Sequence, residues 1–395
     1  MFRLIDTIRN FFRKGDVLLL TLCMLASGLG LVLIYSATRY DPALHNNVFK
    51  QGLFIVMGIV GYVILSFVDI EFIIEKYWKW MFLFNVVFIL LLLTPLGIGE
   101  EDTGNNSWLL FPFLPVTIQP AEVAKLFFVM ILALQCVHNR EWGISRPSSV
   151  FRLVAHTMFM AALIAVVSGD FGMVLVYLFI FIIMSFSAGV KLRWFALGGT
   201  IIAAGITTLA VLSVKSESFM RKFGYIIRRF TEVFTRDDPQ GVGWQQTRSI
   251  LALGSGGLTG QGYLRGIQTQ SASESALPAR HTDEIFAVCG EEFGLIGCIV
   301  VLLILCAIIL RCFWIARCAR SHLSAYIVMG YGAMLLIQTA INIAVCLYLF
   351  PVVGLTLPFF SYGGSSILTL FAAMGIVSGV KMRSLPSWLQ DRSNL

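Results

Sequence analysis

Long apolar runs recur along this 395-residue chain, and they constrain its fold more than any other feature. Each run approaches or exceeds the roughly 20 residues that an α-helix needs to cross a bilayer. Charged residues make up only 13% of the chain, well below the roughly 25% typical of soluble domains. We therefore predict a single all-α polytopic membrane domain over residues 1–395. Its ten transmembrane helices are expected near residues 16–37, 49–68, 80–97, 119–137, 152–168, 171–188, 195–214, 284–310, 325–350 and 365–382.

The basic residues are distributed unevenly between the two sides that these helices define. The termini and the loops on one side hold 17 Lys and Arg residues, whereas the short loops on the other side hold two, Arg39 and Lys50. The positive-inside rule then places both termini in the cytoplasm. The excess of basic residues, a formal net charge of +7, is explained mainly by this membrane orientation. We therefore expect no nucleic-acid partner.

The N-terminal sequence and the cysteines do not indicate a cleaved signal peptide or a reactive site. The apolar run after Lys14 is long for the h-region of a signal peptide, and we interpret it as an uncleaved first helix. The eight cysteines lie in or near predicted helices or at their cytoplasmic ends, and no CxxC occurs. We therefore expect neither a disulfide framework nor a cysteine metal site.

One long polar segment, residues 215–283, interrupts the apolar runs and is predicted to be extracytoplasmic. From Phe219 onward its apolar residues recur at helical spacing, while Arg228 and Arg229 lie on the opposite, basic face. We predict an amphipathic helix in the outer interface. This helix either only anchors the loop or also holds the phosphate of a lipid head group.

The same segment contains a glycine-rich run, Gly254–Gly262. Such a run forms a re-entrant turn or cradles phosphate with its N–H groups, and we favour the turn because the spacing fits neither a Walker A motif nor a dinucleotide fingerprint. Residues 268–276 are rich in Ser and Gln, and we expect a mobile, solvated strip there.

The end of the segment carries His281, Thr282 and Asp283 directly before an apolar helix. Thr282 or Asp283 is placed to cap that helix, and Asp283 is equally placed to act as a general base at the outer mouth of the bundle. Glu291 and Glu292 follow at membrane depth, where carboxylates are costly and point to a function.

Another polar group opens the fourth predicted helix. Glu122 and Lys125 are three residues apart and share one helix face. They form an internal ion pair, or Lys125 faces an anionic substrate, which we favour. Trp108 in the preceding loop is an interface anchor or a platform for a sugar, and Asp170 is expected to cap a helix.

The segment before the last helix combines two prolines, paired glycines and three serines between residues 351 and 366. This composition predicts a broken, re-entrant backbone at membrane depth. Such backbone persists only where it is buried in protein or lines a cavity. We therefore expect a polar cavity near the outer face.

Together these segments resemble the SEDS family of bacterial cell-wall polymerases, the RodA/FtsW type. The resemblance covers nearly the whole chain, and the last three matching segments are highly specific in combination. Residues 262–270 are more similar to RodA, the elongation enzyme, than to FtsW, the division enzyme. The matching segments are Leu33–Ser36, Trp108, Gln119–Lys125, Asp170–Gly172, Ile250–Leu258, Leu277–Pro278, His281–Asp283, Phe286–Glu292 and Leu357–Ser366.

The resemblance implies a peptidoglycan glycosyltransferase in the bacterial cytoplasmic (inner) membrane. Its substrate is lipid II, which it polymerises into glycan strands at the outer face during cell-wall elongation and cell-shape maintenance. The implied partners are a class B penicillin-binding transpeptidase and membrane proteins of the elongation complex. No cofactor is certain, and a divalent cation, Mg²⁺ or Mn²⁺, is left open.

The resemblance also assigns roles by position. Asp283 matches the family's essential loop aspartate, which removes the proton of an acceptor sugar hydroxyl while that oxygen displaces the lipid pyrophosphate. The residues expected to bind substrate are Trp108, Glu122, Lys125, Arg228, Arg229, His281 and Ser365.

Three departures from the family pattern and three alternative functions remain. Ala121 stands where the family usually has Ser, Ala279 where it has Glu, and Glu284 where it has Phe, so charge around Asp283 is shifted but not removed. The division-specific polymerase is one alternative within the family. A lipid II flippase is the alternative of another class, since the acidic and basic groups within the helices could outline a path, and a structural scaffold is the least favoured.

Overall fold

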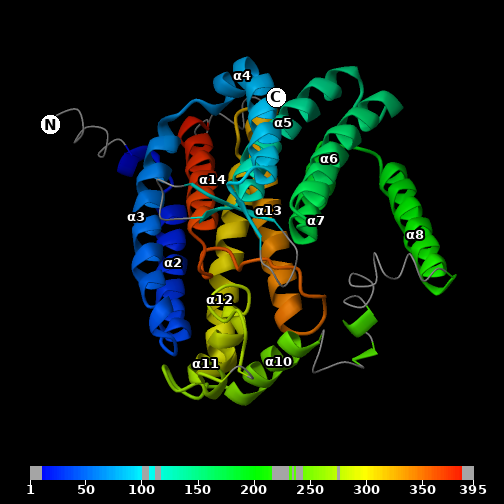
Figure 1. Ribbon diagram of the computed structural model, residues 1–395. Helices are drawn as coiled ribbons and strands as arrows, with labels where there is room; N and C mark the ends of the chain where they lie inside the picture. The colour runs from blue at the N-terminus through cyan, green and yellow to red at the C-terminus, as the bar shows by residue number, and fades with distance from the viewer. Residues whose placement is uncertain are drawn as a thin grey trace.

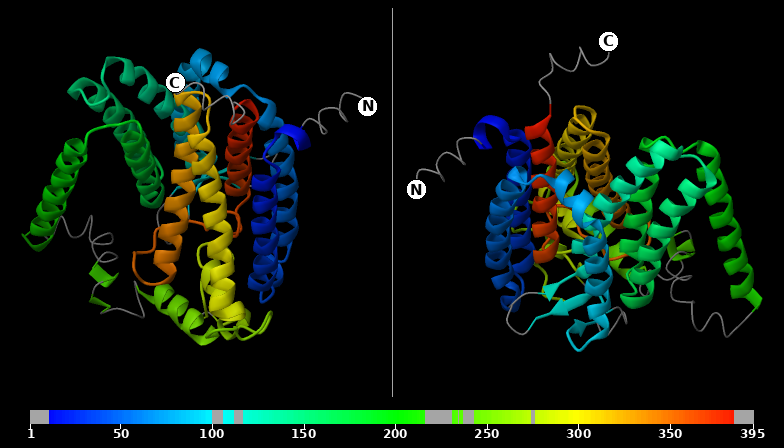
Figure 2. Two further views of the ribbon diagram at one scale, coloured as in Figure 1. Left: turned by 180° about the vertical axis from the view of Figure 1, so that it is seen from behind. Right: turned by 90° about the horizontal axis from the view of Figure 1, so that it is seen from above.

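The structure is a computed structural model that describes residues 11–99, 106–111, 117–215, 231–233, 235–236, 243–273 and 276–384. Over these residues the chain folds into a bundle of long helices, with α8 standing apart from the others (Figures 1 and 2). Each of the ten predicted spans corresponds to one long helix, and the predicted all-α fold is confirmed. These helices are α2 (Val17–Thr38), α3 (Asn46–Phe67), α4 (Ile70–Leu90), α5 (Pro120–Trp142), α6 (Pro147–Val167), α7 (Phe171–Ser187), α8 (Leu192–Lys215), α12 (Ile285–Arg317), α13 (His322–Cys346) and α14 (Gly364–Arg383).

Within the described ranges, eight helical segments are long and apolar enough to cross a membrane, while α7 and the apolar part of α8 are shorter. The remaining elements are small. They are the 3₁₀ turns η1 (Pro42–Leu44) and η2 (Leu91–Leu93), the helices α10 (Trp244–Gly256) and α11 (Ile267–Gln270), and the strands β1 (Gly97–Ile98), β2 (Trp108–Leu110) and β3 (Thr117–Ile118). The three strands form an antiparallel sheet in the order β1-β2-β3, just before α5.

Helix α4 begins at Ile70, and the predicted start near residue 80 is wrong. The carboxylate of Asp69 accepts a hydrogen bond from the N–H of Phe72 (3.4 Å) and so caps the helix ten residues earlier. The ammonium group of Lys76, inside the helix, lies 5.6 Å from the centre of the Phe72 ring. Charged residues did not end this helix because aromatic neighbours and the flexible lysine stem accommodate them.

A buried carboxylate joins three helices at one end of the bundle. Asp16 is fully buried, and its Oδ2 lies 2.9 Å from Nε of Arg311. Its Oδ1 lies 3.6 Å from Nζ of Lys381. Helix α12 extends to Arg317, beyond the predicted end at residue 310. Its Arg311 can lie inside the helix because Asp16, which precedes α2, neutralises its charge. We call this the basic end, and we call the opposite end, which holds α10 and α11, the loop end (Figure 1).

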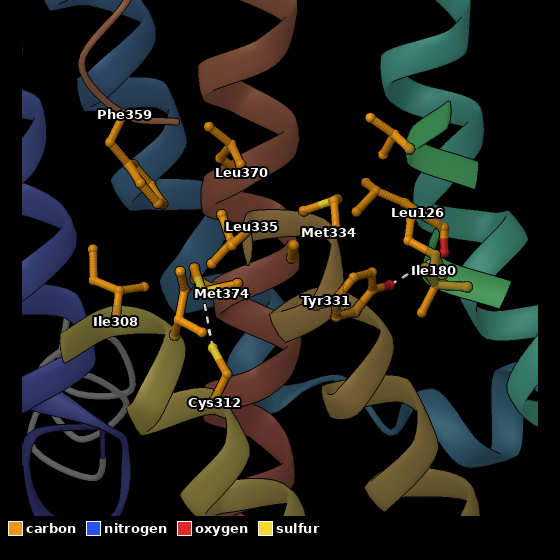
Figure 3. Packing of buried hydrophobic residues seen from close by; sticks show 14 of the residues in the cluster. Leu126, Ile180, Ile308, Cys312, Tyr331, Met334, Leu335, Phe359, Leu370 and Met374 are labelled. Carbon is orange, nitrogen blue, oxygen red and sulfur yellow. Dashed lines mark hydrogen bonds between the residues drawn. The ribbon is translucent and has the colours of Figure 1, made fainter. Parts of the chain in front are cut away.

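Helix α13 lies at the centre of the bundle and packs against α5, α7, α12 and α14. Its Tyr331 is fully buried, and the phenol donates a hydrogen bond to the carbonyl of Leu126 in α5 (3.2 Å; Figure 3). Nearby, the Sγ of Cys312 in α12 lies 3.7 Å from the Sδ of Met374 in α14 (Figure 3). The polar groups carried by α13 are therefore held in fixed positions.

Helix α12 is interrupted near the loop end, and the glycine-rich run supplies hydrogen-bond partners to the backbone groups at the interruption. Gly294 has φ 67° and ψ −163°, which interrupts the helical hydrogen bonds. The N–H of Leu295 donates instead to the carbonyl of Gly257 (2.9 Å), and the N–H of Gln261 donates to the carbonyl of Glu291 (2.9 Å). Such pairing is required where water cannot satisfy the backbone. The glycine-rich run thus begins in the last turn of α10 and then forms a turn that folds back on α12, which agrees with the turn that we favoured.

The two acidic residues of α12 hold backbone and side chains of neighbouring segments. The Oε2 of Glu291 accepts from the N–H (2.8 Å) and the hydroxyl (2.6 Å) of Thr269, and its Oε1 accepts from the N–H of Gln268 (2.7 Å). The Oε1 of Glu292 accepts from the hydroxyl of Ser36 in α2 (2.6 Å). The prediction of a mobile, solvated strip is therefore wrong at its start, because Glu291 binds the N–H groups of α11 there.

The predicted amphipathic helix, including Arg228 and Arg229, lies outside the described residues except for short pieces at 231–233 and 235–236.

Candidate active site

The loop before α12 is fastened by its backbone to the segment before α14. The carbonyl of His281 accepts a hydrogen bond from the N–H of Tyr362 (2.8 Å), and the carbonyl of Thr282 accepts one from the hydroxyl of Ser361. The same Ser361 oxygen accepts from the N–H of Leu357 (2.8 Å). Residues 351–363 contain no helix, which confirms the predicted broken backbone. This non-helical segment acts as a rigid bracket for the loop.

Asp283 is the third residue held in this way. Its carbonyl accepts from Nδ2 of Asn342 in α13 (2.7 Å), and the same nitrogen donates to the carbonyl of Leu355 (2.8 Å). The side chain is half-buried and faces the bracket, since a Cβ added at Gly354 would lie 3.9 Å from Oδ2 of Asp283. The carboxylate is therefore presented from a backbone that is fixed on both sides.

Glu284, the next residue, occupies the N-cap position of α12, so the prediction that Thr282 or Asp283 caps this helix is wrong. Thr282 is unable to do so because its hydroxyl bonds within its own turn, to the carbonyl of Ala279 (3.2 Å). The Glu284 side chain is fully buried, and its Oε1 accepts from Nε2 of Gln245 in α10 (3.0 Å). Burial raises the pKa of the Glu284 carboxyl above its ordinary value.

His281 lies beside the bracket with its ring centre 5.8 Å from that of Tyr362. Burial, and secondarily the charge of Arg280, lower the pKa of the His281 imidazole. A neutral imidazole at neutral pH can exchange hydrogen bonds with a sugar hydroxyl but contributes no positive charge toward a pyrophosphate.

Arg280 is an organising residue that the sequence analysis missed. Its Nε donates to the carbonyl of Leu277 (2.9 Å), and its Nη1 donates to the carbonyls of Thr269 and Ser271. The guanidinium also lies 3.6 Å from the ring centre of Tyr40. Arg280 therefore fixes the path of the loop between α11 and α12. A lone arginine between an alanine and a histidine gave no signal of this role.

Glu122 and Lys125 form a buried ion pair near the start of α5. The ammonium Nζ of Lys125 lies 2.7 Å from Oε2 of Glu122, and the two side chains are 0% and 3% exposed. The other carboxylate oxygen accepts from Nε2 of Gln338 in α13 (3.3 Å). The geometry matches the internal-pair alternative, because Lys125 presents no surface to a substrate in this conformation.

Ser365 and Asp170 belong to the same polar group. The backbone N–H of Gln119 donates to the hydroxyl of Ser365 (3.3 Å), and the Gln119 side chain donates to Oδ2 of Asp170 (2.8 Å). Oδ1 of Asp170 caps α7 by accepting from the N–H of Met173 (2.9 Å), as predicted. Burial raises the pKa of the Asp170 carboxyl to about 6. These side chains fasten helix ends to one another.

Helix α13 links this group to the loop of Asp283. Gln338 binds Glu122 and Asn342 binds the carbonyl of Asp283. The two amides are four residues apart, so they lie on one face of α13, about 6 Å apart along its axis. One face of α13 thereby connects the backbone of Asp283 with the Glu122–Lys125 pair.

The other predicted site residues are less closely tied to this centre. Trp108 lies in β2, paired with Ile98 of β1, and is half-buried. Arg228 and Arg229 fall outside the described residues. Among the residues that the structure describes, no group of three or more His, Cys, Asp or Glu side chains is arranged to hold a metal ion.

A hollow of about 830 Å³ lies at the basic end, away from this centre, and is lined by Glu71, Glu75, Glu141 and Arg320 among others. Its walls come from α4, α5 and the connection between α12 and α13. Because it sits at the opposite end of α12 from Asp283, it takes no part in the site described above.

Comparison with known proteins identifies the chain. Residues 16–385 match the model of the FtsW, RodA and SpoVE family, described as a cell cycle protein. The probable peptidoglycan glycosyltransferase FtsW of Trichlorobacter lovleyi is 29% identical over 394 residues, covering 97% of this chain and 98% of that protein. Stage V sporulation protein E of Bacillus subtilis is 32% identical over 380 residues, covering 93% of this chain and 97% of that protein.

Solved structures agree. A chain of a peptidoglycan synthase complex, solved to explain how polymerization and crosslinking are coordinated, superposes with a TM-score of 0.71 at 26% identity, covering 93% of this chain and 97% of that chain. Rod shape determining protein RodA of Thermus thermophilus superposes with a TM-score of 0.64 at 25% identity, covering 94% and 98%. The chain therefore belongs to the FtsW, RodA and SpoVE family, the SEDS family that its motifs resemble.

Proposed function

We propose that this chain is a peptidoglycan glycosyltransferase that polymerises lipid II into glycan strands, with Asp283 as its general base. The observation that carries the proposal is the fastening of the His281–Asp283 backbone to the bracket and to α13, which leaves the Asp283 carboxylate half-buried beside Gly354. The names of the FtsW relatives support the reaction class. A catalytic base needs this kind of fixed geometry.

In the proposed step, the Asp283 carboxylate takes the proton of an acceptor sugar hydroxyl. The hydroxyl oxygen forms a new bond to the anomeric carbon of the growing chain, and the bond from that carbon to the lipid pyrophosphate breaks. The pyrophosphate leaves on the lipid with the bonding electron pair. Accurate placement of the base and the acceptor supplies much of the rate.

Neighbouring carboxylates are poorer candidates for the base. Glu291 and Glu292 are buried and occupied by hydrogen-bond donors of α11 and α2. Glu122 is paired with Lys125, and Glu284 is fully buried against α10. These assignments also weaken the flippase alternative, because residues that could outline a path through the bilayer serve as fixed internal partners.

Positive charge for the departing pyrophosphate is a separate part of the proposal. Arg228 and Arg229 are the cations that the amphipathic pattern provides, and Trp108, His281 and Ser365 are proposed to line the sugar-binding side. A divalent cation, Mg²⁺ or Mn²⁺, would supply further positive charge there, and adding EDTA to the polymerisation assay tests this need directly.

We place the loop end at the outer face of the cytoplasmic membrane and both termini in the cytoplasm. The distribution of Lys and Arg supports this orientation. The contact of Lys381, near the end of α14, with Asp16, just before α2, supports a common side for the two ends of the chain. Periplasmic and cytoplasmic reporter fusions at the two termini test the assignment.

The proposed partners are a class B penicillin-binding transpeptidase and the membrane proteins of the elongation complex. The similarity to a chain of a peptidoglycan synthase complex supports a cross-linking partner. The similarity of residues 262–270 to RodA favours elongation, whereas relatives named FtsW favour the division role as the alternative. Depletion followed by microscopy separates them, since loss of elongation gives round cells and loss of division gives filaments.

One experiment tests the reaction class. Purified protein is incubated with lipid II, with and without the transpeptidase, and glycan strands are resolved by gel electrophoresis. Strands that require Asp283 support the proposal. Translocation of lipid II in vesicles without any polymer would establish the flippase instead.

A further inference from the structure

Asn342 occupies a special position in α13. It is 1% exposed, and both hydrogens of its amide are used, one on the carbonyl of Asp283 (2.7 Å) and one on that of Leu355 (2.8 Å). These acceptors lie on two separate segments, the loop before α12 and the bracket. One side chain thus joins both segments to the central helix.

The amide of Asn342 gives the Asp283 carbonyl its shortest hydrogen bond. The first hydrogen bonds of α12 go to the carbonyl of Glu284, which accepts from the N–H groups of Ala287 (3.0 Å) and Val288 (3.2 Å). The carbonyl of Asp283 is therefore left out of the helix. A buried carbonyl without a partner is unfavourable. Asn342 provides the closer donor at 2.7 Å, and the thiol of Cys346, with its Sγ 3.8 Å away, provides a weaker one.

We propose that Asn342 is a positioning residue for Asp283, fixing the peptide from which the carboxylate projects. Ser361 assists by holding the preceding carbonyl, that of Thr282. The inference rests on the proposed function, because it takes Asp283 as the base. A loss of position near 1 Å at a reacting group lowers the rate by about 100-fold, whereas substrate affinity set elsewhere changes little.

The chain offers a closely matched control. Asn85 in α4 is 0% exposed, and its Nδ2 also donates to a backbone carbonyl, that of Ala124 (3.0 Å). In both asparagines, Oδ1 has no hydrogen-bond partner within the described residues. Asn85→Ala therefore removes the same chemical group from the same kind of buried environment without touching the loop of Asp283.

The test compares Asn342→Ala and Asn85→Ala as purified full-length proteins polymerising lipid II. We expect kcat of Asn342→Ala to fall by about 100-fold with KM changed less than about threefold. We expect Asn85→Ala to stay within about threefold of wild type in both. In an Asp283→Asn background, adding Asn342→Ala should lower the residual rate no further, because a positioning residue acts through the group it positions.

Three results would overturn the inference. They are an Asn342→Ala rate within threefold of wild type, an equal loss in Asn85→Ala, or multiplied losses in the Asp283→Asn background. If Asn342→Ala does not fold, Ser361→Ala replaces it, with a smaller expected loss of about tenfold and the same absence of further loss with Asp283→Asn.

Hydrogen exchange separates this inference from the proposed function. Amides of residues 277–286 should exchange faster in Asn342→Ala than in wild type and unchanged in Asn85→Ala. If Asp283→Asn keeps wild-type activity, the proposed function fails, and the exchange measurement alone then decides whether Asn342 fixes the loop. Unchanged exchange in Asn342→Ala would refute that as well.

Discussion

The Glu122–Lys125 pair allows a test with a magnitude that follows from its burial. The side chains are 3% and 0% exposed, with 2.7 Å between Oε2 and Nζ. Lys125→Met leaves Glu122 buried without its cation, and removing one partner of a buried pair typically costs about 3–5 kcal/mol. Replacing both with Glu122→Gln and Lys125→Met removes both charges and largely keeps the volume, so we expect a loss of less than about 2 kcal/mol. The new amide oxygen can still accept from Gln338.

Stability is measured as the unfolding temperature of detergent-purified protein. Samples heated to a series of temperatures are analysed by size-exclusion chromatography with fluorescence detection, which reports the fraction that remains folded. Lys125→Met should unfold at a clearly lower temperature than the double variant, and Glu122→Gln alone should also be less stable than the double variant. A Lys125→Met protein as stable as the double variant would refute the view that the pair serves internal neutralisation.

The same variants decide the substrate role that we favoured for Lys125 from the sequence. If Lys125 contacts lipid II after a conformational change, the double variant should be folded yet inactive in the polymerisation assay. If the pair only fastens α5 to α13, the double variant should keep activity within a few-fold of wild type. The burial of Lys125 now favours the second result.

Four further outcomes are expected. Asp283→Asn should lower the polymerisation rate by about 10²–10⁴-fold while thermal unfolding stays close to that of wild type. Glu291→Gln should destabilise the protein by about 2–3 kcal/mol, because the introduced NH₂ group faces donors of α11; unfolding equal to wild type would contradict this. Reversing Arg228 and Arg229 to Glu should raise the KM for lipid II if these residues hold the pyrophosphate, and an unchanged KM would leave them as a membrane anchor. Burial raises the pKa of Glu284 above its ordinary 4.5. The stabilising contribution of the protonated carboxyl is therefore complete below about pH 4.5 and is lost as pH rises through the raised pKa. In a series of unfolding temperatures measured against pH, Glu284→Gln should remove this loss of stability with rising pH.

The architecture was predictable because a bilayer imposes a single length scale. Ten apolar runs became ten helices. The boundaries were less predictable where charged residues continue a helix. Lys76 lies inside α4 beside aromatic rings, and Arg311 lies inside α12 because Asp16, distant in sequence, neutralises it. No local pattern contains that partner.

The loop motif indicated candidate site residues, but it did not indicate the contacts that these residues make. Asp283 and His281 were identified from the loop motif, and the structure brings them to the bracket. The partners of Arg280 could not be predicted, since it donates to four backbone carbonyls only because the segment of α11 folds back beside it. The burial of Lys125 was also hidden, because spacing shows a shared helix face but not what covers it.

Several motifs that looked like chemistry are partners of one another. Ser36 of the first motif binds Glu292 of a later one, Gln119 binds Ser365, and the carbonyl of Thr282 binds Ser361. Each pair satisfies polar groups in surroundings where water is scarce, so each half constrains the other. A motif in such a bundle therefore indicates first that its residues hydrogen-bond to other segments, and only then that they take part in catalysis. The carboxylate of Asp283 differs from the buried acids around it, because hydrogen bonds hold its backbone while its side chain is only half-buried. That contrast is the physical reason to place the base there.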